Sequence, residues 1–422
     1  MRSYLIVFAF FTFTFFSCQP TANYQQTKTD KFSEVKSKPT PQPSLYVPGE
    51  TVEKSLKWLI EAQNENGAWG AGSHAKQQIR DPRAVQVDPA TTAFAGMALI
   101  RSGNTLKSGV YSNQLMKALD YLLETVEKAP ETGNNITTLT GTQPQVKLGQ
   151  NIDASMASRF FTRILPHAEH NQQLKSRIIE AQNKCLRKIQ GAQAADGSIS
   201  GGTWAGVLQS AVATMALEEA AEAGDFKVDS AKLQKIREYN AGNVDIQSGA
   251  VSTDKAAGVS LYSYSSTTRS TAKQARKTKD VLQKAQAMGT FGEVEMDDIE
   301  ITEENLQKAG MKEEEAKEMV RDFRANEVAK RQVQQERVMT GYGNNGGEEF
   351  LSHMMTSESL VVTGGEEWQS WNQRIKTMLA SIQNPDGSYS GHHCITSPVF
   401  CTAAVILTLT VENDPTLIPK ED

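Results

Sequence analysis

Cysteine is scarce in this chain, which has four in 422 residues. Cys18 follows an N-terminal apolar run, so Cys185, Cys394 and Cys401 remain for the rest of the protein. Three thiols form at most one disulfide, for which Cys394 and Cys401 are the pair nearest in sequence. A dense disulfide framework of the kind found in small secreted domains is therefore excluded.

Positive charge is also in short supply. The chain has 44 Lys and Arg against 49 Asp and Glu, for a net charge of -5, and its basic residues are scattered. A nucleic-acid-binding domain typically carries a basic patch or stripe. Nucleic acid is therefore not expected as a partner.

The N-terminal apolar run, residues 5–16, is too short for a bilayer span, which takes about 20 residues, and has the length of the apolar region of a secretory signal. It ends in Phe15-Phe16-Ser17-Cys18, which resembles the lipobox of bacterial lipoproteins. The resemblance implies cleavage before Cys18 and lipid attachment to its thiol. It predicts an exported envelope lipoprotein, periplasm-facing or in the outer membrane, whose lipid is its membrane contact. An ordinary secreted protein with an unmodified Cys18 is the alternative.

One short pattern occurs three times: Gln, three residues, Gly, one residue, and a large apolar or aromatic residue. An aliphatic residue that closes a helical pattern lies four positions before each Gln. The copies are Gln63, Gly67 and Trp69; Gln193, Gly197 and Ile199; and Gln383, Gly387 and Tyr389. Each Gly is placed to end a helix and turn the chain.

An apolar segment follows each turn, at residues 91–100, 207–221 and 399–409. Gln193 and Leu217 are 24 residues apart, as are Gln383 and Leu407. Equal spacing of helix end, turn and second helix indicates a repeated helical hairpin, and thus an all-α fold.

Charged residues dominate from about residue 270 to residue 340, with sparse apolar positions. This composition predicts a charged helical insertion, which is either a solvated arm or a docking surface for a protein partner. The polar, Pro-containing residues after the signal predict a flexible tether. The expected organisation is a signal at 1–17, a tether at 18–48, repeats at 49–269, the insertion at 270–340, closing repeats at 341–413 and a tail at 414–422.

The recurring frame is similar to the QW motif of the terpene cyclase and protein prenyltransferase superfamily. Residues 59–69 match the motif fully, and the other copies have Ile199 and Tyr389 in place of Trp. The resemblance covers roughly residues 50–412. Its last part, DGSYSG followed by SPVFCTAAVILTLTVEND, resembles the closing repeat of squalene-hopene-cyclase-like bacterial proteins. The resemblance implies an (α/α) toroid of about five to six helical hairpins around a central cavity.

The acid that squalene cyclases use is missing from this sequence. Those enzymes protonate their substrate with Asp-x-Asp-Asp, in which neighbouring carboxylates keep one Asp protonated. The nearest string, Glu295-Met296-Asp297-Asp298, lies in the charged segment, where hydrated carboxylates are poor acid catalysts. A cyclase cavity also needs many aromatic faces to stabilise carbocations, and aromatic residues make up 7% of the chain. Polyene cyclisation is therefore not expected.

A candidate metal site lies at His392, His393 and Cys394, just before the last helix. Protein prenyltransferases hold zinc with Asp, Cys and His near the cavity, and thiolate and imidazole are zinc ligands. The spacing fits no zinc motif, so a fourth ligand would have to come from Asp88, Asp153 or His353. We expect no cofactor, with zinc at this site as the alternative. His392 and Cys394 also have the residue types of nucleophilic catalysis.

Three aspartates, Asp88, Asp153 and Asp254, stand at the start of expected inner helices. They are placed either to line one mouth of the cavity or to cap the free N–H groups of their own helices. The sequence thus predicts a non-catalytic lipoprotein whose toroid binds an apolar small molecule or acts as a scaffold. The alternative is a divergent prenyltransferase or terpene-cyclase-like enzyme with its centre near His392, His393 and Cys394.

Overall fold

The computed structural model describes residues 49–201 and 203–418. The expected signal, the lipid-bearing Cys18 and the tether lie outside the described residues, as does the end of the tail at 419–422. Between residues 49 and 418 the described chain forms α-helices, short 3-10 turns and isolated β-bridges. The expected all-α class is confirmed.

Six helical hairpins follow one another along the chain, each with an outer and an inner helix. They are α1 (Glu50–Glu61) with α2 (Pro89–Arg101), α3 (Ser112–Lys128) with α5 (Ile152–Ile164), α6 (Gln172–Gly191) with α7 (Gly206–Ala223), α8 (Ser230–Ala241) with α9 (Ser260–Ala287), α11 (Glu313–Val333) with α13 (Gly347–Thr363), and α14 (Gly365–Ser381) with α15 (Pro398–Leu409). The connections contain the short helices α4 (Gln143–Leu148), α10 (Glu303–Lys308) and α12 (Glu336–Met339).

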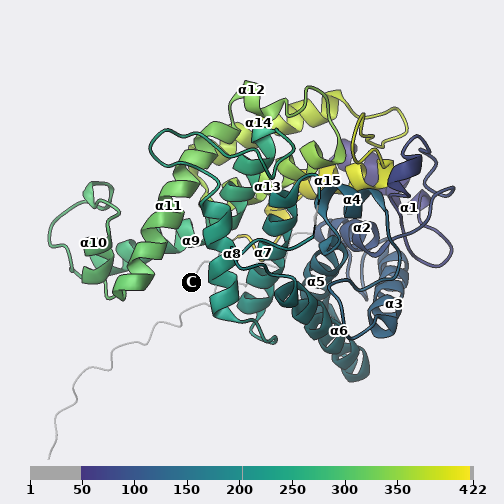
Figure 1. The fold of residues 1–422 in the computed structure, drawn as a ribbon, viewed down its shortest axis with the longest axis horizontal. Helices are drawn as coiled ribbons and strands as arrows, with labels where there is room; N and C mark the ends of the chain where they lie inside the picture. The colour runs from purple at the N-terminus through teal and green to yellow at the C-terminus, as the bar shows by residue number, and fades with distance from the viewer. Residues whose placement is uncertain (1–48, 202, 419–422) are drawn as a thin grey trace, which may run out of the picture. The chain divides into compact units, whose positions relative to one another are not determined.

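The inner helices form a closed ring (Figure 1). Each of α2, α5, α7, α9, α13 and α15 packs against the next, and α15 packs back against α2. Every residue from Val207 to Ala220 of α7 is buried, whereas the outer helix α1 buries one stripe of four residues. A helix that is buried all round belongs to the interior, and a helix with one apolar stripe covers it. The expected toroid of helical hairpins is confirmed.

The three recurring turns bind the next outer helix in the same way. The side-chain amide of Gln63 donates to the Gln114 carbonyl in α3 at 2.9 Å, and that of Gln193 donates to the Lys232 carbonyl in α8 at 2.8 Å. Gln383 donates to the Thr51 carbonyl in α1 at 2.8 Å. The last turn therefore holds the first helix and completes the ring.

Both backbone conformation and close packing require glycine at these three turns. Gly67, Gly197 and Gly387 have φ of 82°, 93° and 93°, a region that favours glycine. A Cβ at each would lie 2.4 to 2.6 Å from an atom of the next outer helix. The aromatic residue two positions later ties the turn to its own hairpin, since Trp69 donates to the Leu59 carbonyl at 2.8 Å and Tyr389 to the Leu379 carbonyl at 3.0 Å.

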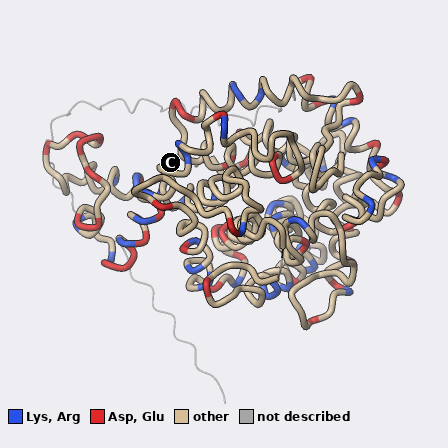
Figure 2. The backbone as a smooth tube through the Cα atoms, turned by 45° about the horizontal axis from the view of Figure 1, so that its top comes forward, with Lys and Arg blue, Asp and Glu red and all other residues tan. Residues whose placement is uncertain are grey.

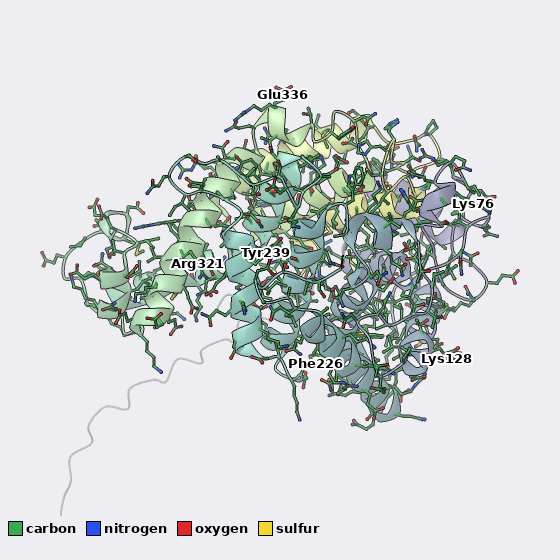
Figure 3. The ribbon with its side chains drawn as sticks, in the orientation of Figure 1. Lys76, Lys128, Phe226, Tyr239, Arg321 and Glu336 are labelled. Atoms are coloured by element: carbon green, nitrogen blue, oxygen red, sulfur yellow. The ribbon has the colours of Figure 1, made fainter. Side chains whose placement is uncertain are left out.

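The structure divides the charged segment differently from the sequence prediction. α9 runs through the expected boundary at residue 270, and it is buried without interruption from Leu261 to Ala272. α11 is the outer helix of the fifth hairpin and packs against α8, α9 and α13. Figure 3 labels Arg321 on α11 and Tyr239 on the neighbouring α8. Most of this segment is therefore part of the toroid.

The part that projects from the ring is an arm made of the end of α9, residues 288–312 and the start of α11 (Figure 1, left). It has a small apolar cluster of its own, formed by Leu282, Ile299, Leu306, Ala316, Met319 and Val320. Residues 293–318 contain eleven acidic and three basic residues, visible as the red segments of the arm in Figure 2.

Two further expectations are corrected by the structure. α9 begins at Ser260, so Asp254 lies exposed in the preceding loop and does not cap it. Cys185, Cys394 and Cys401 are all free, so the pair nearest in sequence is not bonded. Among the helices described here, none has both the length and the apolar character needed to cross a membrane.

Candidate functional site at the mouth of the ring

Groups from the first turns of neighbouring inner helices meet at one end of the ring, which shows that these helices run in the same direction. Asp153 of α5 accepts a hydrogen bond from the Ala90 amide of α2 at 3.2 Å, and Tyr262 of α9 donates to Glu349 of α13 at 2.6 Å. We call this end, where the helix N-termini gather, the mouth. Groups near the last turns meet at the opposite end.

Asp88 and Asp153, both singled out in the sequence, lie together at the mouth. Asp88 is the N-cap of α2, accepting from the Thr91 amide at 2.8 Å, and its second oxygen accepts from the Ala71 amide at 2.8 Å. Burial, with the charge of Asp153 second, raises the pKa of Asp88 to about 7. Burial also raises the pKa of Asp153 to about 6, against hydrogen bonds from Gln145 and Asn135. The two carboxyls fix the start of α2.

Two neighbouring glutamates at the start of α13 complete the acidic layer of the mouth. Glu349 accepts from the Gly346 amide at 2.8 Å and from Tyr262 Oη at 2.6 Å. Glu348 is fully buried; one oxygen accepts from the Ile395 amide at 3.1 Å, and Oε1 has no partner among the described residues. Burial, followed by the charge of Glu349, raises the pKa of Glu348 to about 8, so this carboxyl is mostly neutral at pH 7.

The run His392, His393 and Cys394 crosses the mouth, but its side chains meet different neighbours. His392 is exposed, whereas His393 Nε2 lies 2.7 Å from the Asn344 carbonyl oxygen. Cys394 is half-buried with φ of 56°, which is rare for a residue other than glycine. Burial and then the charge of Glu348 raise the pKa of its thiol to about 12. The thiol is therefore neutral, and a neutral thiol is a weak nucleophile and metal ligand.

Within residues 49–201 and 203–418, no group of three or more His, Cys, Asp or Glu is arranged to hold a metal ion. His353, considered above as a fourth ligand, is buried further along α13. Its ring centre lies 6.3 Å from that of Trp371, on the outer helix α14. The structure thus brings Asp88 and Asp153 together and separates His353 from the mouth.

Lys147 of α4 reaches the same mouth. Its side chain is buried, and Nζ lies 4.1 Å from the ring centre of Trp204 in the α6–α7 connection. Lys147 lowers the pKa of the Glu348 and Cys394 side chains, which places its charge close to both. Trp204 itself is 57% exposed.

A pocket of about 290 Å³ opens at the rim of the mouth. His392, Arg80, Asn344, Asn345, Asn384 and Ser390 give it a polar lining, and Phe350, Ile382 and Tyr389 give it apolar surface. Arg80, on the long connector that also carries Lys76 (Figure 3), donates through Nη1 to the Gly391 and Thr396 carbonyls at 2.6 and 2.8 Å. The connector is thereby tied to the loop that carries the predicted residues.

The opposite end of the ring is filled by charge. Four arginines and four acids form a buried network, namely Arg101, Arg159, Arg163, Arg269, Glu218, Glu219, Glu358 and Asp414. Glu358 lies at its centre, 2.6 Å from Arg101, 3.1 Å from Arg159 and 2.9 Å from Arg269. Burial opposes ionisation, but the arginines outweigh it and hold the pKa of Glu358 well below its ordinary value. Eight ionised side chains from five inner helices and the segment after α15 therefore occupy this end.

Sequence reasoning missed the network, Lys147 and Glu348. One signal was available for the network: Arg101, Arg159 and Glu358 are charged residues in the middle or at the end of helices that are rich in small and apolar residues. A charge on an all-round buried helix must be paired. Lys147 carries no comparable signal, because α4 is a short helix in a connection.

A closed all-α toroid of six helical hairpins is the class of protein that this fold defines. No protein-family model and no curated protein matches the chain. Among solved structures, the chain is similar to the type II terpene cyclase MstE from Scytonema. The apo enzyme has 11% identity, with 87% of this chain and 98% of that one covered and a TM-score of 0.35. A variant in complex with its substrate, geranylgeranyl dihydroxybenzoate, has 11% identity, covers 87% and 97%, and has the same TM-score of 0.35. A likeness at this level carries no argument about activity.

Proposed function

We propose that the protein is a non-catalytic binding protein of the bacterial envelope, held to the membrane by lipid on Cys18, with the mouth of its toroid as the ligand site. The buried charge network carries the non-catalytic part of the proposal. A polyene substrate needs a deep apolar cavity with aromatic walls. Here four arginines and four acids fill one end of the ring instead, and displacing any one of them would leave its partners buried and unpaired.

The carboxyls at the mouth also support a structural role. Asp88 accepts hydrogen bonds from the Ala71 amide and from the amide and hydroxyl of Thr91. Asp153 accepts from the Ala90 amide and from two side-chain amides. The carboxylate oxygens of both residues thus accept hydrogen bonds from the protein itself, which suits a structural role more than contact with a substrate. The rim pocket, with amide and hydroxyl groups over an apolar floor, has the mixed lining of a small-molecule site.

The test combines ligand retention with turnover. Full-length protein purified under mild conditions is examined by native mass spectrometry, and then incubated with squalene and with geranylgeranyl diphosphate before product analysis. A binding protein is supported if a small molecule stays bound through purification, is not chemically altered by the protein, and no product forms from either isoprenoid. Conversion of either isoprenoid by the purified protein would refute the proposal.

The membrane part has its own test. Cys18→Ala removes the thiol that would carry lipid, so the variant is expected in the soluble fraction while the parent protein stays with membranes. Mass spectrometry of the parent should show a lipid-modified N-terminus beginning at Cys18. Equal membrane association of both proteins would contradict lipid anchoring.

A divergent enzyme is the second candidate, and one observation favours it. Glu348, beside Cys394, is a buried carboxyl with a raised pKa and an unpartnered oxygen, which are the properties of a general acid. Isoprenoid turnover that is lost in Glu348→Gln would support this reading and overturn the binder.

A protein partner is also part of the proposal, with its contact limited to the arm. The helices α9 and α11, which make up most of the remainder of residues 270–340, pack against other helices of the ring. Replacing residues 289–311 with a short Gly-Ser linker should abolish capture of such a partner while far-UV circular dichroism of the toroid is unchanged.

A further inference from the structure

The rim pocket has one charged residue in its lining, and that residue is basic. Two larger pockets on the outer surface have charges of both signs: the one between α3 and α6 is lined by three glutamates, a lysine and an arginine, and the one beside α1 and α14 by Glu50, Lys376 and Glu412. Among the described residues that line the rim pocket there is no Asp, Glu or Lys, and Arg80 carries its one permanent charge. The pocket therefore suits a ligand with a negative group.

The guanidinium of Arg80 is held by one of its three nitrogens. Nη1 donates to the Gly391 and Thr396 carbonyls at 2.6 and 2.8 Å, whereas Nε and Nη2 form no hydrogen bond or ion pair within the described chain. Arg177 shows what these two nitrogens bind elsewhere in this structure, since its Nε and Nη2 donate to the two carboxylate oxygens of Glu127 at 2.8 and 3.2 Å. The planar fork of arginine matches a carboxylate in this way. Arg80 is thus fixed in place with its carboxylate-binding edge unused.

Unused amide groups also line the pocket. Asn344 and Asn345 contact the neighbouring histidine loop through their backbone carbonyls, and their side-chain amides form no hydrogen bond within the described chain. Asn384 adds a third amide and Ser390 a hydroxyl. An amide offers both donors and an acceptor, and a hydroxyl group does the same. The polar lining therefore suits a ligand with several hydroxyl groups.

We propose that the rim pocket binds a monomeric sugar acid, with its carboxylate on the Nε and Nη2 edge of Arg80 and its ring hydroxyls on the asparagine amides. This inference rests on the proposed binding function and names the ligand class. The volume of about 290 Å³ is at the lower end for small-molecule sites and suits a single sugar ring. The C–H face of such a ring can pack on Ile382, which is 39% exposed.

Both parts of the ligand are needed to use the lining. A neutral sugar would leave the edge of Arg80 without a partner, and an apolar acid would take the amides out of water without replacing their hydrogen bonds. A phosphate group carries up to two negative charges at pH 7, of which Arg80 balances one. A carboxylate on a hydroxylated ring matches both the charge and the hydrogen-bonding groups.

The test compares four ligands that differ by one feature each. D-glucuronate has the carboxylate and the hydroxyls, glucose lacks the carboxylate, cyclohexanecarboxylate lacks the hydroxyls, and glucose 6-phosphate has phosphate as its anionic group. Binding to the full-length protein is measured at pH 7 by calorimetry, with ligand-observed NMR for weak ligands. We expect glucuronate to bind about tenfold more tightly than each of the other three, the effect of one charge-assisted two-point contact.

Two variants separate the roles of the pocket residues. Arg80→Gln should weaken glucuronate binding about tenfold, to the level of glucose, and leave glucose binding unchanged. Asn345→Ala, which does not touch the contacts of Arg80, should weaken both glucuronate and glucose about threefold and leave cyclohexanecarboxylate unchanged. Lys76→Gln, which removes an exposed lysine from the same connector, is the matched control and should bind all four ligands as the parent does.

A purely structural role for Arg80 gives a different result. If Arg80 only held the loop at Gly391, Arg80→Gln would weaken glucose and glucuronate equally, and the proposal would be overturned. Equal binding of glucuronate and glucose by the parent, tighter binding of glucose 6-phosphate, or an unchanged affinity in Asn345→Ala would also overturn it.

Absence of glucuronate binding to the folded parent overturns the sugar-acid site by itself and leaves a binding protein with another ligand. The proposed function fails on a separate result, namely isoprenoid turnover, which sugar binding does not affect. The two failures are therefore distinguishable.

Discussion

The side-chain amide of Gln383 donates to the backbone carbonyl of Thr51, 332 residues earlier in the chain, at 2.8 Å. The same amide lies 3.0 Å from Ser55 Oγ and 3.2 Å from the Gly387 carbonyl oxygen. One side chain thus joins the last turn to the first helix. In the other two copies the same contact joins consecutive hairpins.

Gln383→Ala should loosen this closure. Loss of a partly buried amide and its hydrogen bonds is expected to lower the free energy of unfolding by about 1–2 kcal/mol. Hydrogen exchange should rise in α1 more than in α8, because α1 is the helix that the side chain holds. Gln373→Ala, at an exposed position of α14, is the matched control. A uniform rise in exchange over all helices would contradict a local closing contact.

Gly387→Ala should be more damaging than a glycine replacement in open space. Gly387 has φ of 93°, and a Cβ there would lie 2.6 Å from the Lys54 carbonyl oxygen. Gly289 in the arm has φ of 81° but no atom within 4 Å of such a Cβ, so Gly289→Ala measures the backbone strain alone. We expect a loss of about 1 kcal/mol for Gly289→Ala and at least about 2 kcal/mol more for Gly387→Ala in urea unfolding. Equal losses would mean that the turn yields to the added methyl group.

Glu358→Gln should destabilise the ring strongly. It leaves Arg101, Arg159 and Arg269 buried with one negative charge fewer, and breaking a buried pair in this way typically costs about 3–5 kcal/mol. Chemical unfolding at pH 7 measures the loss, and Glu366→Gln on the exposed face of α14 is the control. A loss below about 1 kcal/mol would indicate that the network relaxes around the change.

The network also has a pH signature. The folded-state pKa of Glu358 is held well below its ordinary value of 4.5. Its stabilising contribution is therefore complete above pH 4.5 and is lost as the pH falls through the lower folded-state value. The parent protein should lose more stability than Glu358→Gln when acidified below pH 4.5.

Glu348 has the opposite pH dependence. Its folded-state pKa is raised from 4.5 to about 8, so the folded protein binds a proton that the unfolded chain releases. The stability from this proton is complete below pH 4.5 and is lost as the pH rises through 8. Between pH 5 and pH 9 the parent should therefore lose roughly 3–4 kcal/mol more stability than Glu348→Gln, whose amide oxygen can still accept from the Ile395 amide.

The melting temperature across this pH range provides the measurement. Asp88, which has a pKa of about 7, also titrates in this range, so the melting temperature of Glu348→Gln still falls somewhat as the pH rises. Glu336→Gln, on an exposed residue of α12 (Figure 3), should reproduce the parent curve. Curves for Glu348→Gln and the parent that run parallel would contradict the raised pKa.

The ring could be predicted because its signals are local and repeated. Gln63, Gln193 and Gln383 each stand before a glycine that ends a helix, and the equal spacing to the next apolar helix repeats the hairpin. The same local reasoning misplaced α11. The buried face of α11 includes Asp322, Asn326 and Lys330, so its apolar positions alone were too sparse to show that it packs in the ring.

The mouth and the network could be predicted only in part. Asp88 was found because Asp-Pro at a helix start is a local signal for a cap. Arg101 and Glu358 are 257 residues apart, and their pairing depends on the closure of the ring. Lys147 and Cys394 likewise come from different hairpins. A single sequence gives the helices but not which charges meet inside them.

The meeting of the first and last helices has a consequence for the chain's connectivity. Gly49 at the start of α1 and Asn413 beyond α15 line one surface groove. A short peptide could therefore join a point beyond Asp414, which has to stay in the buried network, to Gly49, and the chain could be reopened at Gly292 in the arm. Such a circularly permuted protein should fold to the same ring, because a closed arrangement of equivalent hairpins has no preferred place to begin.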